Sequence, residues 1–508
     1  MTRADRIALI LSLLAVIAGY LVHERVFERM AHLEDEMAYV WQAQTIAGGH
    51  LTLASPPGQK SFLVPFVVDY NGQRFGKYPL GWPVLLAIGE RMGIRFLVNP
   101  LLAGLAVWLT YLLGKRVFST TVGLLAAGLT LTSPFFLINS GSLLSHPFGL
   151  VLSAGFALAW LGTFCDQNAT RRSLSAVAAG LTLGVLALTR PLTAVALGIP
   201  FGLHGIYLFI KKDCYTRRLL ILVAAIILAL ASLYFVWQYV ATGDPFLNPY
   251  TLWWEYDRFG FGPGHGRKPQ GHTLNQAWIN TRQSLRIGSH DLFGWAAYSW
   301  IFLPFGLLVI LRERNWRALL LGSIFPTLVV LYLGYWIGSS LFGPRYFYEG
   351  LYSLTLTSAA GIAFLAGWPI NEGQPWPNYS GWRRIRPLAV TALVTALVSY
   401  NLIVYTPIRL GKMHGLYGVS RSHLEPFLTP SAQDLTPALV IVHPADGWIE
   451  YGTLIELETS YLDTPFIFVI SRGPRVDNAL AQDFPERGVY HYYPDEPYSF
   501  YTQPRPKP

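Results

Sequence analysis

Long apolar stretches alternate with short polar connections along the first four-fifths of the chain. Eleven of them come close to the roughly 20 residues with which a helix crosses a bilayer. Each must be helical, because lipid offers backbone amides no hydrogen-bond partner. The predicted spans are residues 7–22, 97–114, 120–139, 147–164, 174–189, 193–210, 217–240, 293–311, 317–337, 349–368 and 387–405. The pattern therefore predicts an all-α polytopic membrane protein, with its membrane domain over residues 1–405.

A further apolar run, GWPVLLAIGERMGI at 81–94, is short, and Glu90 and Arg91 interrupt its end. The distribution of basic residues decides whether it crosses, because such residues concentrate in cytoplasmic connections. If 81–94 does not cross, about 16 basic residues fall on one side, and the short connections opposite hold chiefly Arg190 and Arg345. If it crosses, every later basic cluster lies outside while the N-terminus stays inside.

The 16 residues are Arg3, Arg6, Lys115, Arg116, Arg171, Arg172, Lys211, Lys212, Arg217, Arg218, Arg312, Arg314, Arg317, Arg383, Arg384 and Arg386. We therefore predict a multi-pass cell-membrane protein with about eleven spans, a cytoplasmic N-terminus and an extracytoplasmic C-terminal end. Residues 81–94 then lie in the outer interface or dip into it.

Composition agrees with this class. Of 508 residues, 52% are hydrophobic and only 13% charged, and the mean hydropathy is +0.36. A soluble chain usually carries about twice that charged fraction. The net charge of +9 is spread over separate connections, so it reflects topology, and no nucleic-acid partner is predicted. Both cysteines, Cys165 and Cys214, fall at predicted cytoplasmic ends, where thiols stay reduced.

Four regions are predicted on the outer side: residues 23–96, 140–147, 241–292 and a tail from 406. Within the tail, ALVIV (438–442), FIFVI (466–470) and GVYHYY (488–493) have the pattern of short buried strands. The stretch GWIEYGTLIELETSYL between the first two is compatible with a helix. We therefore predict a small extracytoplasmic α/β domain over residues 406–508.

Three adjacent carboxylates, Glu34, Asp35 and Glu36, lie near the start of the stretch 31–49 of the first outer loop. Apolar side chains at helical spacing and a Gly48–Gly49 stop predict an amphipathic helix lying on the membrane. In one interpretation the acidic residues only complement the helix dipole. In the other, one carboxylate removes a proton from an acceptor hydroxyl. Crowding and partial desolvation are then expected to raise its pKa above about 3.9 and make it a stronger base.

The acidic stretch resembles the Asp-Glu motif in the first external loop of GT-C membrane glycosyltransferases, especially the protein O-mannosyltransferase and aminoarabinose transferase relatives. Four further stretches are similar in order and placement: GKYPLGWPVLLA (76–87), WLTYLLGKRVFSTTVGLLAAGLTLTSP (108–134), LALTRP (186–191) and GPRYFYE (343–349). The resemblance covers about residues 25–200 and 335–360. It implies an inverting glycosyltransferase that moves a sugar from a polyprenyl-phosphate or polyprenyl-diphosphate carrier to a glycan, lipid or protein acceptor on the outer side.

By this resemblance Asp35 is the candidate catalytic base, with Glu36 beside it. Glu34 is an addition to the motif, so the assignment can shift by one residue. Arg345 is the candidate that stabilises the leaving phosphate, because a guanidinium offers paired, fixed donors. Its alternative role is that of a snorkelling residue that anchors a helix end.

The predicted substrate-binding set is completed by Glu34, Tyr39, Arg74, Lys77, Tyr78, His146 and Tyr346. Lys77 and Arg74 would share the phosphate, although Tyr78 separates Lys77 from the proline that its counterpart directly precedes in the family. SLLSHP, with His146, stands where many relatives have a second acidic residue. The imidazole could hydrogen-bond the acceptor or phosphate, pair with Asp35 when protonated, or cap the next helix. Because that second acidic residue is absent, we predict that no metal and no other cofactor is required.

The loop 241–292 carries WWEYDRFGFGPGHGRKPQGH, which mixes aromatic, basic and glycine residues. It suits a mobile lid with phosphate-binding cations, or an ordinary aromatic interfacial loop. A transporter or flippase without transferase activity is the main alternative function. Transport usually needs ionisable residues inside the membrane, whereas the predicted spans hold mainly neutral polar exceptions such as Asn99, His204 and Asn401. An inactive scaffold with the same fold is a third interpretation.

Overall fold

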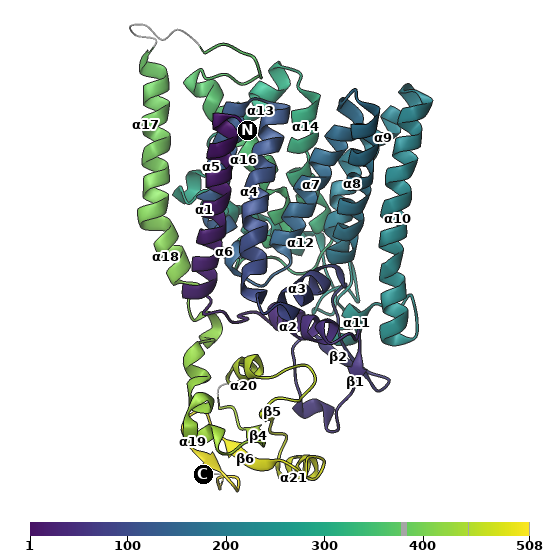
Figure 1. Cartoon of the computed structure of the whole chain (residues 1–508), viewed down its shortest axis with the longest axis vertical. Helices are drawn as coiled ribbons and strands as arrows, with labels where there is room; N and C mark the ends of the chain where they lie inside the picture. Colours follow the sequence, from purple (N-terminus) through teal and green to yellow (C-terminus); the bar gives the residue numbers. More distant parts are fainter. Residues whose placement is uncertain (377–383, 446, 507–508) are drawn as a thin grey trace.

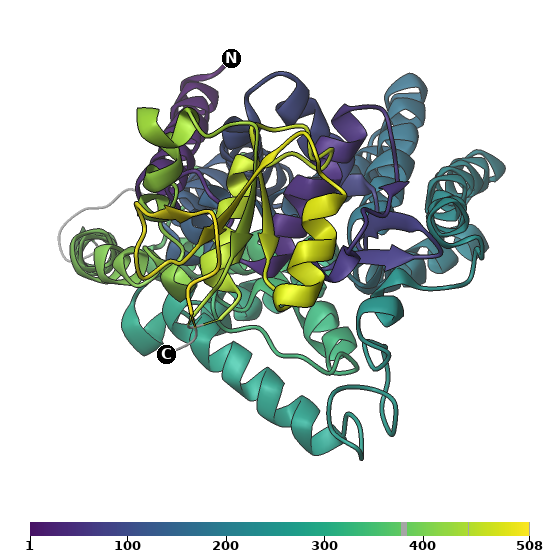
Figure 2. The same ribbon diagram turned by 90° about the horizontal axis from the view of Figure 1, so that it is seen from below.

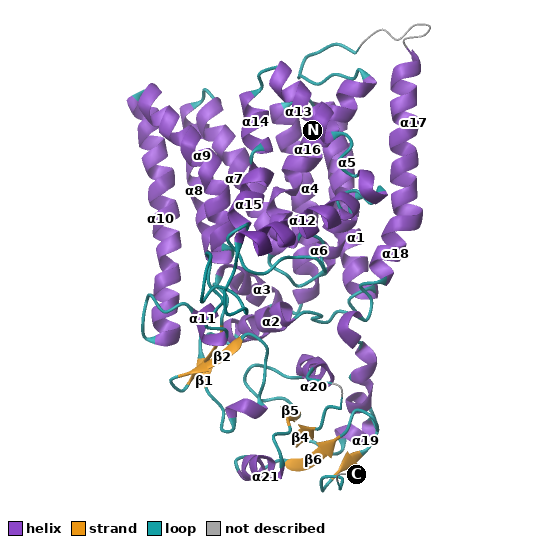
Figure 3. Cartoon of the chain, turned by 180° about the vertical axis from the view of Figure 1, so that it is seen from behind, coloured by secondary structure: helices purple, strands orange, loops and turns teal. Residues whose placement is uncertain are grey.

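The computed structural model describes residues 1–376, 384–445 and 447–506. Long helices run side by side in a bundle, and one end of the bundle carries two short crossing helices and, beyond them, a small sheet domain (Figure 1). Strands are confined to that end of the molecule (Figure 3). Arg383, one of the basic residues used to predict topology, lies outside the described residues.

Each predicted span contains helix, although α-helix begins only at Leu303 in the span 293–311 and ends at Tyr332 in the span 317–337. The helices are α1 (Arg3–Arg25), α4 (Val98–Val117), α5 (Thr120–Leu131), α6 (Pro134–Gly141), α7 (His146–Cys165), α8 (Ala169–Thr189), α9 (Pro191–Lys211), α10 (Cys214–Thr242), α13 (Leu303–Arg312), α14 (Trp316–Gly322), α15 (Ile324–Tyr332), α16 (Leu351–Ala366) and α17 (Ile385–Tyr400). Side-chain caps start several of them: Ser119, Ser133 and Asn168 each accept a hydrogen bond from a backbone N–H three residues on.

Within the described residues, seven helices are long and apolar enough to cross a membrane, or up to nine if each of two bent pairs counts as one span. The first pair, α5 with α6, is bent by 60°, and the second, α12 (Leu274–Asp291) with Ala296–Arg312, by 102°. The apolar segment Trp316–Tyr332 and helix α16 are shorter. The polytopic helical class is thus confirmed, while the count of eleven spans stays a prediction.

Helices α2 (Glu34–Ala47) and α3 (Gly81–Arg91) cross the end of the bundle (Figure 1). With 11 residues, α3 is about 16 Å long, roughly half of the bilayer's hydrocarbon core. This length fits the interpretation in which 81–94 does not cross. The chain segment that connects the two helices forms a three-stranded antiparallel sheet in the order β1 (Leu53–Ala54), β3 (Gln73–Gly76), β2 (Val67–Tyr70).

The prediction of an amphipathic surface helix in the stretch 31–49 is correct about the helix and its glycine stop but wrong about its environment. Helix α2 begins at Glu34 and ends before Gly48, yet almost every residue from Glu36 to Ala43 is buried. Protein covers it on several sides, because α3 packs along it and the C-terminal domain docks against it: Tyr461 donates a hydrogen bond to Thr45 O at 2.8 Å. Of the three acidic residues at the N-terminus of α2, Glu36 is buried, Asp35 is partly buried and Glu34 is exposed.

The C-terminal domain holds a four-stranded sheet in the order β5 (Phe466–Ile470), β4 (Ala438–Val442), β6 (Gly488–Tyr492), β7 (Phe500–Tyr501). The first three strands are parallel and β7 is antiparallel, so the predicted strands are confirmed. The predicted helix shrinks to α20 (Ile449–Gly452) and a 3-10 turn (Thr453–Leu457). Seen along the bundle from this end, the domain overlies α2 and its neighbours (Figure 2). Small helices complete the structure: α11 (Pro249–Trp253), α18 (Thr406–Gly411), α19 (Pro430–Gln433) and α21 (Pro474–Gln482).

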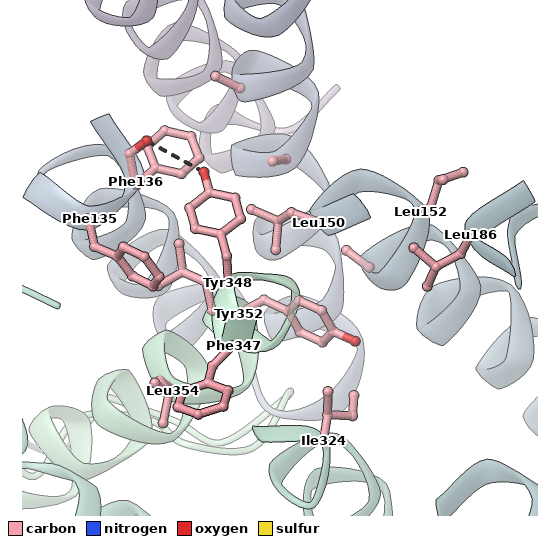
Figure 4. Packing of buried hydrophobic residues seen from close by; sticks show 14 of the residues in the cluster. Phe135, Phe136, Leu150, Leu152, Leu186, Ile324, Phe347, Tyr348, Tyr352 and Leu354 are labelled. Carbon is pink, nitrogen blue, oxygen red and sulfur yellow. Dashed lines mark hydrogen bonds between the residues drawn. The ribbon is translucent and has the colours of Figure 1, made fainter. Parts of the chain in front are cut away.

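Aromatic packing fixes the short 3-10 helix η4 (Arg345–Gly350) against the bundle. Tyr348 meets Phe135 of α6 edge to face at 5.0 Å between ring centroids, and its hydroxyl donates to Phe136 O at 3.4 Å (Figure 4). The side chain of Tyr348 is fully buried. Since η4 begins with Arg345, this packing sets where that guanidinium can point.

Candidate functional site

A cavity of about 920 Å³ lies at the end of the bundle that carries α2. Its walls come from α2, the loop 66–78, the α8–α9 junction, the 241–292 loop, the segment 332–346 and the C-terminal domain. Eight of the residues predicted from the sequence line it: Glu34, Asp35, Tyr39, Lys77, Tyr78, His146, Arg345 and Tyr346. Glu36 and Arg74 do not.

Asp35 and Arg345, 310 residues apart in sequence, form an ion pair in this cavity, with 3.3 Å between Asp35 Oδ2 and an Arg345 terminal nitrogen. The hydroxyl of Tyr78 donates a second hydrogen bond to Asp35 Oδ1. Both charged side chains keep some exposure, 25% for Asp35 and 18% for Arg345. The pair is thus open to a ligand and held by fixed donors.

The electrostatics of the acidic trio differ from the expectation for Asp35. Burial alone would raise the pKa of Asp35, but Arg345, the Tyr78 hydrogen bond and Lys77 outweigh burial and lower that pKa below its ordinary value. The expectation of a raised pKa is therefore wrong for Asp35, because the sequence does not show its cationic neighbour. Burial and the neighbouring Asp35 do raise the pKa of Glu34.

Glu36 lies behind the cavity wall and is only 1% exposed. One carboxylate oxygen accepts hydrogen bonds from the backbone N–H groups of His32 and Leu33, and the other accepts from Leu143 at 2.7 Å. Burial raises the pKa of Glu36 to about 7, against the opposing effect of these donors. Glu36 therefore ties the start of α2 to the loop before α7, and it makes no contact with the cavity.

Replacing Glu36 by glutamine should lower the thermal stability of the purified protein. An amide has one acceptor oxygen and one donor nitrogen, so at least one of three buried N–H groups loses its acceptor. We expect a loss of about 1–3 kcal/mol, the usual cost of such a group. Denaturation in detergent, followed by a fluorescent probe, measures it. A Tm equal to that of the wild type would show that the hydrogen bonds accepted by Glu36 do not stabilise the protein.

Lys77 sits in an aromatic enclosure on the cavity wall. Its ammonium is 3.8 Å from the ring centroid of Phe66 and 4.9 Å from that of Trp254. Asp257 accepts a hydrogen bond from it at 3.2 Å and is itself bound by Tyr335 and Trp336 at 3.0 Å. Burial lowers the pKa of Lys77, and Asp257 offsets part of this effect. Arg74, by contrast, donates to Phe62 O and lies 3.9 Å from Asp69, away from the cavity.

His146 is the first residue of α7, and its Nδ1 lies 3.1 Å from Glu349 Oε1. The same oxygen is 2.9 Å from Arg190 Nε. The sequence shows no carboxylate near His146, but folding brings one from 203 residues away. Arg190 and Glu349 were missed as site residues. The available signals were that Arg190 is one of few basic residues predicted outside, and that Glu349 closes the stretch GPRYFYE.

The 241–292 loop forms a wall of the cavity through Tyr250, Trp254, Asp257, Phe259 and Arg267. Its glycine-rich part is tied to neighbouring backbone: Gly260 N–H donates to Gly334 O at 2.8 Å, and Gly262 N–H to His272 O at 2.9 Å. Gly262 has φ of +92°, a conformation that favours glycine. The glycines therefore serve a defined, hydrogen-bonded turn.

In the part of the chain that the structure describes, no group of three or more His, Cys, Asp or Glu side chains could hold a metal ion. The prediction that no metal is required stays a prediction.

The comparisons with known proteins concern the fold. No family model matches the sequence, and no curated protein matches it. Among solved structures, the aminoarabinose transferase ArnT from Cupriavidus metallidurans, bound to undecaprenyl phosphate, is similar with a TM-score of 0.59 and 14% identity over 95% of this chain and 89% of that chain. An oligosaccharyltransferase from Archaeoglobus fulgidus in the apo form has a TM-score of 0.53 and 14% identity over 95% of this chain and 69% of that chain.

A further similar structure is the archaeal oligosaccharyltransferase AglB from Archaeoglobus fulgidus in complex with an inhibitory peptide and a dolichol-phosphate, with a TM-score of 0.50 and 14% identity over 90% of this chain and 64% of that chain. These proteins are GT-C glycosyltransferases. The chain therefore has the GT-C fold of a multi-pass membrane protein, and the resemblance seen in the sequence is confirmed at the level of the fold.

Proposed function

We propose that the protein is an inverting glycosyltransferase. It would take a sugar from a polyprenyl-phosphate or polyprenyl-diphosphate carrier and transfer it to an acceptor on the extracytoplasmic side. The observation that carries this proposal is the meeting of Asp35 and Arg345 in one large cavity. Direct displacement at an anomeric carbon requires a base for the acceptor and a cation for the leaving phosphate, both within reach of one substrate.

In the proposed reaction, the acceptor oxygen attacks the anomeric carbon while the ionised Asp35 accepts the acceptor's proton. The bond between that carbon and the phosphate oxygen breaks, and its electron pair stays on the phosphate. Attack on the face opposite the leaving group inverts the configuration. Arg345 has five N–H groups, of which one binds Asp35, so others are free to meet the growing negative charge. Lys77 lines the same cavity and supplies a second cation.

The carrier class is supported by two similar structures, since ArnT was crystallised with undecaprenyl phosphate and AglB was solved with a dolichol-phosphate. The cavity also has a place for such a lipid. Val195, which is 55% exposed, and Ile337, which is 37% exposed, belong to its lining and add uncovered apolar surface to it. A polyprenyl tail would leave the cavity along these side chains, with the phosphate inside.

We further propose that the cavity end of the bundle faces the extracytoplasmic side, with the C-terminal domain there and the N-terminus in the cytoplasm. The basic clusters of the connections at the far end, such as Lys115–Arg116 at the end of α4 and Arg171–Arg172 at the start of α8, support this orientation. The C-terminal domain would then take part in the site, because Tyr417 and Trp448 line the cavity. We propose that they form the wall against which the acceptor lies.

The purified protein should carry a polyprenyl phosphate. Native mass spectrometry of the detergent-solubilised chain is expected to show one bound lipid of this class, or one after addition of undecaprenyl phosphate. A transfer assay with a lipid-linked sugar from the source membrane then tests turnover. A bound polar solute together with no affinity for undecaprenyl phosphate would instead favour the transporter alternative.

A further inference from the structure

We propose that Arg190 is a second phosphate-binding side chain of this cavity and that Glu349 is the positioning residue that aims it. The inference rests on the proposed function, because it assumes a lipid-phosphate ligand. Neither residue belongs to the site predicted from the sequence. The structure carries the assignment through the backbone at Arg190, its hydrogen bonds, and the burial of Glu349.

The backbone places Arg190 at a break between two helices. Helix α8 ends at Thr189 and α9 begins at Pro191, and Arg190 between them has φ −145° and ψ 80°, outside the helical region. Proline disfavours the helical conformation for the residue before it, so the break follows from the Arg-Pro pair. One residue is thereby turned out of both helices, and its side chain lines the cavity.

The guanidinium of Arg190 is held by four groups. Its Nε donates to Thr193 Oγ1 at 3.4 Å and lies 2.9 Å from Glu349 Oε1. Its two terminal nitrogens donate to Ser145 Oγ at 3.2 Å and to the Tyr332 hydroxyl at 3.3 Å. Arginine has five N–H groups, so two remain for a ligand among the described residues. The side chain is 12% exposed, and this exposure is toward the cavity that it lines.

Glu349 forms an ion pair with Arg190 from the side away from the cavity. It is completely buried and does not line the cavity. One oxygen lies 2.9 Å from Arg190 Nε, in an ion pair, and 3.1 Å from His146 Nδ1, while the other has no hydrogen-bond partner among the described residues. Room for this carboxylate exists because α7 has a glycine beside it: a Cβ at Gly149 would lie 2.7 Å from Glu349 Oε1.

Such a buried charge is an expensive way to hold a fold. Ion pairs of this kind can often be replaced by packed apolar residues without loss of stability. What an apolar replacement could not do is fix the direction of a guanidinium at a cavity wall. Orienting Arg190 is therefore the role that best explains why Glu349 is buried there.

Arg190 and Arg345 belong to the same wall. The Tyr332 ring, whose hydroxyl accepts from Arg190, stacks on Tyr346 with 5.1 Å between centroids and 5° between planes. The Arg345 guanidinium lies 5.6 Å from the Tyr346 ring centroid. Arg345 is partly neutralised by Asp35, whereas the phosphate released from a monophosphate carrier gains a second negative charge as the sugar leaves. A second guanidinium on this wall would meet that charge.

The test is a titration of the purified full-length protein with undecaprenyl phosphate. Arg190→Ala should weaken binding about 10- to 100-fold, and Glu349→Gln about 3- to 10-fold. The double variant should bind no more weakly than Arg190→Ala alone, because Glu349 acts through Arg190. Arg190→Lys keeps the positive charge but lacks the planar set of guanidinium N–H donors, so it should also bind undecaprenyl phosphate more weakly than the wild type.

The matched control is Asp166→Asn, which breaks a comparable arginine–carboxylate pair with Arg116 just beyond the other end of α7. It should leave the affinity for undecaprenyl phosphate unchanged. Equal binding by Arg190→Ala and the wild type would overturn the inference and leave the proposed function standing. An additional loss from Glu349→Gln in the Arg190→Ala background would remove Glu349 as a positioning residue. A wild type that does not bind the lipid would overturn both proposals.

Discussion

Replacing Asp35 by asparagine should slow sugar transfer about 10³-fold, while the protein still folds and still binds undecaprenyl phosphate. The asparagine fills the same space and can accept a hydrogen bond from Tyr78, but it cannot take a proton from the acceptor. The expected loss corresponds to about 4 kcal/mol in the barrier and lies within the range seen for a general base. Single-turnover transfer with a preloaded lipid-linked sugar measures it.

The pH dependence separates Asp35 from Glu34 as the base. Because the pKa of Asp35 is lowered below its ordinary value, Asp35 stays ionised throughout pH 5–8, and transfer should not fall on the acid side of that range. The pKa of Glu34 is raised above its ordinary value. If Glu34 were the base, the transfer rate would fall as the pH drops through the raised pKa of Glu34, because the carboxylate would become protonated. Glu34→Gln is the control variant and should retain most activity. Near-normal turnover by Asp35→Asn would exclude Asp35 as the base.

Replacing Arg345 by alanine should have the second largest effect, a loss of about 10²- to 10³-fold in the transfer rate. One preorganised donor to a developing oxyanion is usually worth this much. Binding of undecaprenyl phosphate should weaken as well. The measurements are the rate of transfer at saturating donor and the dissociation constant of the lipid. A side chain that merely anchored a helix end would change neither.

Arg345→Ala should also shift the acid limb of the pH profile. In the wild type, Arg345 opposes the effect of burial on Asp35 and lowers its pKa. When this cation is removed, less opposes the effect of burial, and the pKa of Asp35 rises. A larger share of the Asp35 carboxyl is then protonated at low pH. Residual transfer should therefore fall at a higher pH than in the wild type. Arg345→Lys keeps a positive charge and should show a smaller shift.

Local patterns were sufficient for much of this structure. The strands at 438–442 and 466–470 have the predicted bounds, because short runs of buried apolar residues between turns leave few alternatives. Apolar length placed helix at every predicted span. The acidic trio and Arg345 stand out by their charge, and the family resemblance selects Asp35 within the trio; the structure brings Asp35 and Arg345 into contact.

Contacts between distant segments were beyond such patterns. The burial of α2 depends on the C-terminal domain, whose position the sequence does not encode locally. The pairing of His146 with Glu349 joins residues far apart in the chain. For the same reason the pKa of Asp35 was predicted in the wrong direction, since its decisive neighbours come from other elements. The role of Glu36 was hidden because its partners are backbone groups.

The contribution of Tyr417 and Trp448 to the cavity wall has a consequence for biogenesis. These residues follow both Asp35 and Arg345 in the chain. During synthesis the acidic segment and Arg345 therefore leave the ribosome before Tyr417 and Trp448. A chain that stops short of these two residues would lack part of the cavity wall and leave the cavity more open to solvent.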